Sequence, residues 1–405
     1  MSDLNKDNKR IPAICGGSPV RSKKLYYSHQ SINEKDIQAV VDVLKSDYLT
    51  TGPAITEMER KLCELTGAKY AVAISNDTAA LHVACMAAGV GKGDEIITTP
   101  ITFAASANCS LYCGGRPVFA DIDPETYQID PDEIEKKITD RTKAVIPVDY
   151  TGQTPDLARI REICDRHGLV MIEDAAHSIG TKYNGEHIGR IADMTTFSFH
   201  AVKTITGGEG GAIVTDSKEL YDKLLLYRAH GITRDVSKMK NTPDGPWYYE
   251  QVALSTNYRI TDMQAALISS QLDRLSEFSE RRTKIRDKYN EAFSKMPELF
   301  VQKETKGCES TRHLYILRIV PEKLRIGRKE FFEALGAENI VCNVHYIPTY
   351  YFPYYQEMGY KKGLCPNAEK LYDEMITIPL YSGMSDSDAD DVIEAVTRIV
   401  EYYRK

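Results

Sequence analysis

The stretch Ser198-Phe-His-Ala-Val-Lys-Thr-Ile-Thr-Gly-Gly-Glu-Gly-Gly211 joins two short apolar runs, 194–199 and 211–215. Continuous apolar runs of this length are typical of strands that are covered on both faces of a sheet. The stretch therefore predicts two buried strands joined by a tight, glycine-rich turn. Its one lysine, Lys203, lies beside this turn, where burial would lower the lysine pKa and leave a free amine.

The sequence on either side of this stretch alternates helical patterns with apolar runs, from about residue 32 to 216. Helices are expected over 34–45, 55–65 and 78–88, and further strands over 70–74, 95–99, 117–121, 144–148 and 169–172. Strands separated by helices predict an α/β fold with a mainly parallel sheet. Ligands of such sheets gather at the carboxyl ends of the strands, and Asp174 and Ser198 both fall at or near such ends.

The C-terminal part begins with a capping-box pattern, Thr261 followed by Gln264, which predicts one long helix to about Phe293. This helix is expected to cross from a large domain into a smaller one. We expect an N-terminal segment over 1–30, a large α/β domain over 31–265 and a small C-terminal α/β domain over 266–405. The charged loop 236–247 is expected to be a mobile surface segment.

Composition excludes several classes of protein. The 405 residues are 42% hydrophobic and 27% charged, with a net charge of −7, which argues against nucleic-acid binding. No apolar run is long enough to span a bilayer, so no membrane association is expected. The nine cysteines include no C-x-x-C pair, and the histidines lack metal-ligand spacing. We expect a cytoplasmic protein without a metal site.

Lys203 and Asp174 together are the two groups that a pyridoxal phosphate enzyme needs. The amine forms a Schiff base with the cofactor aldehyde, and the carboxylate keeps the pyridine nitrogen protonated. The alternatives are a glycine-rich turn before an interior strand and an Asp174 that only caps a turn. A nucleotide-binding P-loop lacks its G-x-x-x-x-G-K-[ST] order here. The spacing alone does not choose between chemistry and structure.

A phosphate site is indicated by Ser75-Asn-Asp-Thr78, which follows a strand and opens a helix. Thr78 would look the same as a plain helix N-cap. Ser198 could add a second hydroxyl to the phosphate. Phe103 could stack on a flat ring, or it could be an ordinary core residue.

Five segments together resemble the DegT-type sugar aminotransferases, a branch of the fold-type I pyridoxal phosphate enzymes. They are Ser46-Asp-Tyr-Leu-Thr-Thr-Gly-Pro53, Thr99-Pro-Ile-Thr-Phe103, Glu173-Asp-Ala-Ala-His177, the Lys203 stretch and Asn257-Tyr-Arg-Ile-Thr-Asp-Met-Gln-Ala-Ala266. The resemblance covers nearly the whole chain. It implies a large α/β domain with a mainly parallel sheet and a smaller C-terminal α/β domain.

The resemblance also implies residue roles. Lys203 would bind the cofactor covalently, and Asp174 would pair with its pyridine nitrogen. The remaining cofactor contacts would be Thr78 and Ser198 at the phosphate with the backbone near Asp77 and Ala79, Phe103 over one ring face, His177 beside the cofactor, and Asn257 reaching in from a neighbouring subunit. The implied active unit is a homodimer with shared sites.

Three segments, 230–235, 246–251 and 344–348, are similar to family members that transaminate a UDP-linked 4-keto-6-deoxy amino sugar with L-glutamate. The implied substrate contacts are Tyr248, Tyr249, His345 and Tyr346, each of which could equally be a loop or core residue. Two departures from the family pattern stand out: Asp77 replaces a usual glycine, and 349–351 replaces a usual Val-His-Leu. The alternatives are a dTDP- or GDP-linked keto-sugar as substrate, or a non-catalytic sugar-binding or regulatory protein. A sugar 3-dehydratase would have histidine in place of Lys203.

Overall fold

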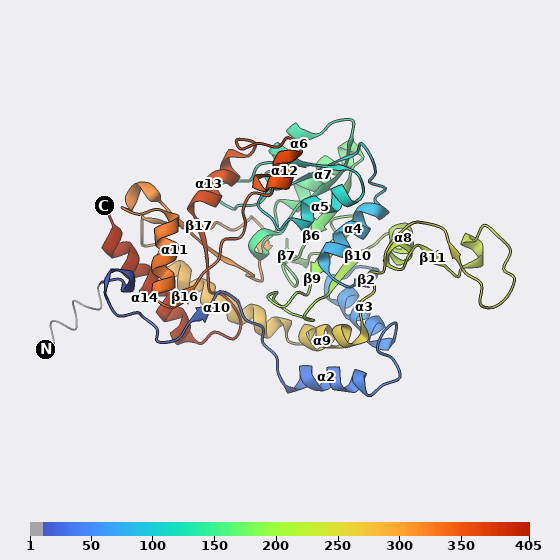
Figure 1. Ribbon diagram of the computed structural model, residues 1–405, viewed down its shortest axis with the longest axis horizontal. Coiled ribbons are helices and arrows are strands. Elements are labelled where there is room, and N and C mark those ends of the chain that lie inside the picture. The colour runs from blue at the N-terminus through green and yellow to red at the C-terminus, as the bar shows by residue number, and fades with distance from the viewer. Residues whose placement is uncertain (1–10) are drawn as a thin grey trace.

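The computed structural model describes residues 11–405, and its centre is a sheet of seven strands (Figure 1). In spatial order the strands are β2 (Tyr70–Ile74), β10 (Gly211–Thr215), β9 (Met194–Ser198), β6 (Val170–Asp174), β5 (Thr142–Ile146), β3 (Glu95–Thr98) and β4 (Arg116–Phe119). β10 runs antiparallel to both of its neighbours, while the pairs from β9 to β4 are parallel. The predicted mainly parallel sheet is confirmed.

Helices cover both faces of this sheet. One face packs against α4 (Asp77–Ala87), α5 (Ala105–Tyr112) and α8 (Lys218–Arg228), and the other against α3 (Pro53–Thr66), α6 (Pro131–Lys137), α7 (Leu157–His167) and α9 (Asp262–Leu272). In β2, Ala71 and Ala73 enter one core while Val72 and Ile74 enter the other. Burial on both faces explains why the strands read as unbroken apolar runs.

The long helix predicted from Thr261 to Phe293 is two helices, so this prediction was wrong. The capping box at Thr261 and Gln264 is present and opens α9, but the helix breaks at Asp273–Arg274, before α10 (Leu275–Phe293). Gln271 and Arg274, on either side of the break, both donate to the buried Asp36 carboxylate of α2 (Glu34–Leu44), at 2.7 and 3.1 Å. A contact with a residue more than 230 positions away ends the helix, and no local pattern reports it.

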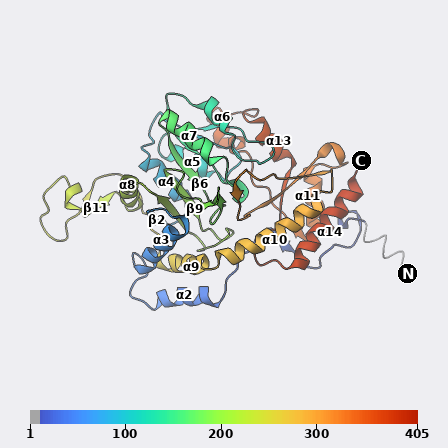
Figure 2. The same ribbon diagram turned by 180° about the vertical axis from the view of Figure 1, so that it is seen from behind.

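Beyond the break, α10 leaves the large core and enters a second one (Figure 2). This second core also contains α11 (Arg328–Ala337), α14 (Asp386–Tyr403) and the strands β13 (Leu299–Val301), β15 (Tyr315–Ile319) and β17 (Met375–Ile378). The N-terminal segment joins it, because β1 (Leu25–Tyr26) pairs with β16 (Ile340–Val341). Of the predicted segment 1–30, residues 1–10 lie outside the described residues. The predicted domain boundaries stay a prediction.

Several short elements complete the chain: β7 (Lys182–Tyr183), β8 (Glu186–His187), β14 (Cys308–Glu309), α12 (Pro353–Glu357) and α13 (Pro366–Glu374). β11 (Ile232–Thr233) and β12 (Glu250–Gln251) belong to a segment, here called the arm (residues 229–257), which projects from the body of the molecule in Figure 1. Over residues 11–405, no helix combines the length and apolar character that crossing a bilayer requires.

Candidate active site

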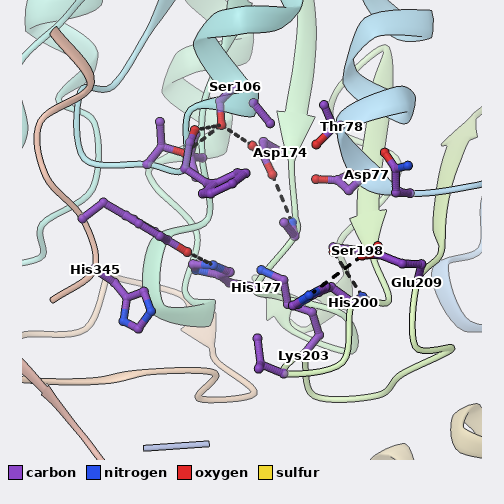
Figure 3. A pocket seen from close by; sticks show the side chains of 18 residues that line it. Asp77, Thr78, Ser106, Asp174, His177, Ser198, His200, Lys203, Glu209 and His345 are labelled. Atoms are coloured by element: carbon purple, nitrogen blue, oxygen red, sulfur yellow. Dashed lines mark hydrogen bonds and ion pairs between the residues drawn. The ribbon is translucent and has the colours of Figure 1, made fainter. Parts of the chain in front are cut away.

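A cavity of about 600 Å³ lies where β6, β9 and the start of α4 meet (Figure 3). Asp174 is the last residue of β6 and Ser198 the last of β9, while Asp77 is the first of α4. All three line the cavity together with Lys203. The parallel sheet thus places its ligand cavity at the carboxyl ends of its strands, as the physics of such sheets leads one to expect.

The Asp174 carboxylate is buried at one wall of the cavity. Ser106 donates its hydroxyl to Oδ2 at 2.6 Å, and the Ala176 N–H donates to Oδ1 at 3.2 Å. Burial raises the pKa of Asp174, whereas these two hydrogen bonds and the Lys203 charge act to lower it. The two donors fix the carboxylate in place, so it can accept a further N–H from a ligand in the cavity.

Lys203 lies on the loop that follows β9. Its backbone N–H donates to the His200 carbonyl at 2.9 Å, which closes the loop into a turn. Burial lowers the pKa of the Lys203 ammonium to about 8, although Asp77 and Asp174 raise it. A substantial fraction of the side chain is therefore a free amine near neutral to mildly alkaline pH, as attack on an aldehyde requires.

An anion cradle lies at the start of α4. The N-cap is Asn76, whose side chain accepts the Ala79 N–H at 2.9 Å, so Thr78 is free to turn its hydroxyl to the cavity. The amides of Asp77 and Thr78 lack acceptors inside the helix, which is the usual state of a first turn. Gly211 allows this close approach: a Cβ there would meet the Asn76 carbonyl carbon at 2.5 Å. With Ser198 opposite, the cradle suits a phosphate.

Aromatic side chains form the opposite wall. Phe103 is 63% exposed and its ring lies 6.2 Å from that of Tyr346. His177 stacks on Tyr346 with a ring separation of 6.0 Å, and its Nε2 shares a hydrogen bond of 3.0 Å with the Tyr346 hydroxyl. His345 is held from behind by Thr377, at 3.0 Å. A flat ring placed between Phe103 and the sheet would be covered on the exposed side.

His177 and His345, which line the cavity with Lys203, are uncharged. Burial, followed by the charges of Lys203 and His345, holds the pKa of His177 well below its ordinary value. Burial and the Lys203 charge lower the pKa of His345 to about 4. Lys203 is the only lysine or arginine among the residues that line the cavity. Its amine is therefore the main basic group that this chain offers a ligand there.

A pair of buried acids lies behind Asp174. Asp149 and Glu173 are fully buried, and each influences the pKa of the other. Ser178 donates to Asp149 at 2.5 Å and Thr195 to Glu173 at 2.8 Å, while the second oxygen of each carboxyl has no other partner among the described residues. Burial raises the pKa of Asp149 well above its ordinary value and that of Glu173 to about 7. The pair thus holds a proton, and it limits the negative charge next to Asp174.

The structure brings most of the predicted residues together. Thr78, Phe103, Asp174, His177, Ser198, Lys203, His345 and Tyr346 line the cavity. Ala79 does not line it, and its N–H donates to the Asn76 side chain instead of facing the cavity. Asn257, Tyr248 and Tyr249 lie on the arm and do not line the cavity. Tyr248 donates to Glu250 at 3.0 Å, and the Arg234 guanidinium lies 5.2 Å from the Tyr249 ring centroid.

Several residues of the site were not predicted from the sequence. Ser106 holds Asp174 from α5, and His200 and Glu209 line the cavity from the glycine-rich loop. Ser106 lies four residues after Thr102, and the two hydroxyls share a hydrogen bond of 2.7 Å. This helical spacing after Phe103 was the sequence signal that could have placed Ser106 in the site. Among residues 11–405 no cluster of three or more His, Cys, Asp or Glu side chains is placed to hold a metal ion.

These residues fit pyridoxal phosphate. Lys203 supplies the amine for its aldehyde, Asp174 the carboxylate for its pyridine nitrogen, and Thr78 with Ser198 the hydroxyls for its phosphate. When bound, the cofactor supplies an electron sink that stabilises negative charge on a substrate carbon.

Comparison with known proteins agrees with this geometry. Residues 30–397 match the model of the DegT/DnrJ/EryC1/StrS aminotransferase family. The spore coat polysaccharide biosynthesis protein SpsC of Bacillus subtilis is 42% identical over 383 residues, which cover 94% of this chain and 98% of SpsC.

Two solved structures are similar throughout. Helicobacter pylori PseC, an aminotransferase of pseudaminic acid biosynthesis, has 31% identity and a TM-score of 0.87, covering 94% of this chain and all of PseC. The putative sugar aminotransferase Spr1654 of Streptococcus pneumoniae, solved in PLP and PMP forms, has 32% identity and a TM-score of 0.87, covering 94% of this chain and 98–99% of Spr1654. The aminotransferases of this family use pyridoxal phosphate, and the chain described here belongs to the DegT/DnrJ/EryC1/StrS aminotransferase family.

Proposed function

We propose that this sugar aminotransferase moves the amino group of L-glutamate to C4 of UDP-2-acetamido-2,6-dideoxy-β-L-arabino-hex-4-ulose. The products would be 2-oxoglutarate and UDP-4-amino-4,6-dideoxy-N-acetyl-β-L-altrosamine, the amino sugar of the pseudaminic acid pathway. The observation that carries the proposal is the shared cavity of Lys203 and Asp174, in a chain whose fold matches PseC over 94% of its length.

Lys203 would act as the proton carrier of the reaction. With its pKa lowered to about 8, Nζ can accept the α-proton of the amino donor and later deliver a proton to C4 of the keto-sugar. Asp174 would hold the pyridine nitrogen in its protonated form, with Ser106 and Ala176 keeping the carboxylate in line. His177 and Tyr346, joined by their hydrogen bond, would cover the side of the cavity next to Lys203.

Substrate recognition is proposed for His345 and Tyr346 from the same chain and for Tyr248 and Tyr249 from a partner subunit. Three features of the arm support shared sites in a homodimer. Leu254 is 84% exposed and Trp247 69%, and the arm carries Arg234, a cation of the kind that the cavity lacks for a diphosphate. Asn257, exposed on the arm, would reach the partner's cofactor phosphate.

Mixing two inactive variants tests the shared site. Lys203→Ala and Asn257→Ala chains, unfolded or dissociated together and reassembled, would regain activity if Asn257 serves the neighbouring subunit. One site of each mixed dimer would then have both an intact Lys203 and an intact Asn257 from the other chain. If the mixture stays as inactive as either parent, Asn257 does not act across the dimer.

The substrate is tested by running the reaction in reverse. Purified protein is incubated with 2-oxoglutarate and a set of UDP-, dTDP- and GDP-linked 4-amino sugars, and mass spectrometry follows which amino sugar disappears and whether glutamate forms. Consumption of the UDP-linked altrosamine derivative supports the proposal. If another amino sugar is consumed in preference, that sugar is the product and the proposed substrate is wrong. If none of them is consumed, the result argues for a non-catalytic sugar-binding protein.

A different nucleotide keto-sugar is the second candidate. SpsC is more similar in sequence than PseC, at 42% against 31% identity, and its name refers to spore coat polysaccharide rather than pseudaminic acid. The same reverse assay separates the two substrates.

We further propose a cytoplasmic location, which the nine free cysteines support.

A further inference from the structure

Asp77 places a carboxyl group inside the anion cradle. It is the first residue of α4, its side chain lines the cavity, and it is only 8% exposed. Its Oδ1 is fully buried and has no hydrogen-bond partner among the described residues. Within residues 11–405, no lysine, arginine or histidine lies close enough to Asp77 to form an ion pair. An ionised carboxylate in this position would be buried without an ion pair and without a hydrogen bond to Oδ1, which is costly.

The groups that face Asp77 come from three elements. Asp174 approaches from β6, Lys203 from the loop after β9, and the neutral Thr196 hydroxyl from β9 (Figure 3 shows the first two with Asp77). Burial and the Asp174 charge raise the pKa of Asp77 to about 8, while Lys203 and Thr196 lower it. Glu209 adds a further carboxylate to the cavity wall, and His200 lies beside it at 3.9 Å. The apo site therefore already holds three carboxyl groups and a single lysine among its lining residues.

A cofactor phosphate brings additional negative charge to the same helix start. The first turn of α4 attracts an anion through its free amides. An ionised Asp77 side chain on that turn would repel the phosphate and compete for the same amides. A protonated Asp77 has neither effect, and its O–H becomes a hydrogen-bond donor inside the cradle.

We propose that Asp77 holds its proton whenever the cofactor is bound, so that cofactor binding takes up a proton from solvent when the apo site has lost it. Asp77 is then a positioning residue that ties cofactor retention to pH. The cofactor is held firmly while Asp77 is protonated and is released more readily as this carboxyl ionises. No bond other than the O–H of Asp77 forms or breaks in this step. This proton uptake accompanies cofactor binding and does not involve the sugar.

Lys203 titrates in the same range as Asp77, so the test must separate the two. Pyridoxamine phosphate is the suitable probe, because it has no aldehyde and does not react with Lys203. Its ionisations in free solution are identical for every variant. Because Asp77 raises the pKa of Lys203, the same comparison is repeated in chains that also carry Lys203→Ala, where only Asp77 differs in charge. Asp77→Asn keeps the side-chain shape and stays neutral. Asp140→Asn, at an exposed position far along the chain on the loop before β5, is the matched control.

The measurement is calorimetric titration of apo protein with pyridoxamine phosphate between pH 6.5 and 9.5, in two buffers of different ionisation enthalpy. We expect the wild-type affinity to fall roughly tenfold for each pH unit above about 8 relative to Asp77→Asn. At pH 8.5 the wild type should take up roughly three quarters of a proton more than Asp77→Asn. The Asp140→Asn variant should match the wild type.

Parallel affinity curves and equal proton uptake in the wild type and Asp77→Asn would overturn the proposal. Tighter binding by Asp77→Asn at every pH would show that Asp77 is ionised throughout, and would overturn it too. If Asp77→Asn does not fold, Asp77→Ser gives the same comparison with a smaller neutral group. No sugar enters the assay, so a failure here leaves the proposed substrate untouched, and a wrong substrate leaves this result untouched.

Discussion

Gly211→Ala should damage the cofactor cradle by pushing against the start of α4. Gly211 pairs with Ile74 in β2 and with Ser198 in β9, so its backbone is held on both sides. A Cβ there would lie 2.5 Å from the Asn76 carbonyl carbon and 2.7 Å from the Asp77 nitrogen. Both are backbone atoms that no rotamer change can remove. The start of α4 must recede by roughly 1 Å to restore an ordinary contact.

The expected cost follows from this displacement. Overpacking of a closely packed interior costs about 1–3 kcal/mol of folding free energy. The same shift moves Thr78 and the first amides of α4 away from the phosphate. Each hydrogen bond to a charged group contributes about 1.5–3 kcal/mol, so losing one should weaken binding tenfold or more.

Urea unfolding of the apo protein and titration with pyridoxamine phosphate measure the two effects separately. Gly336→Ala in α11 is the control, because a Cβ there meets no atom within 4 Å. Alanine in a helix should leave stability unchanged or raise it by up to about 1 kcal/mol. A Gly211→Ala protein as stable as the wild type, with unchanged affinity, would refute the reasoning.

Three further changes have defined outcomes. Lys203→Ala should keep its melting temperature, whereas borohydride followed by peptide mapping should fix the cofactor to the Lys203 peptide of the wild type alone. Glu173→Gln should change the pH dependence of the free energy of unfolding, measured in urea titrations. The pKa of Glu173 is raised to about 7 in the folded protein from its ordinary 4.5. The wild type should therefore lose stability relative to the variant as the pH rises from 4.5 to 7. If the new amide only disturbs the contact with Asp149, the free energy of unfolding would instead differ from that of the wild type by the same amount at every pH. Glu338→Ala should cost about 1–3 kcal/mol in the same measurement, because Arg398 loses its buried partner and keeps only the exposed Glu394 carboxylate, and the Ala13 and Val20 amides lose their acceptor. An unchanged free energy of unfolding would contradict this.

The strands of the sheet could be predicted from the sequence, because strands buried on both faces consist of continuous apolar runs. The predicted strands over 70–74, 194–199 and 211–215 agree with β2, β9 and β10 to within a residue. Asp174 and Lys203 were candidates because one ends an apolar run and the other lies on the loop after another, and the resemblance to the aminotransferase family supplied their roles. Lys203 and Asp174 indeed share one cavity.

The surroundings of these two groups depend on tertiary contacts that no local pattern reports. Ser106 reaches Asp174 from α5, and Asp149 meets Glu173 because β5 lies next to β6 in the sheet. The break after α9 depends on Asp36, and the placement of the arm leaves Asn257 outside its own chain's cavity. These contacts join residues far apart in the chain. Local periodicity reports which face of an element is buried, whereas the identity of the neighbour depends on how the whole sheet is ordered.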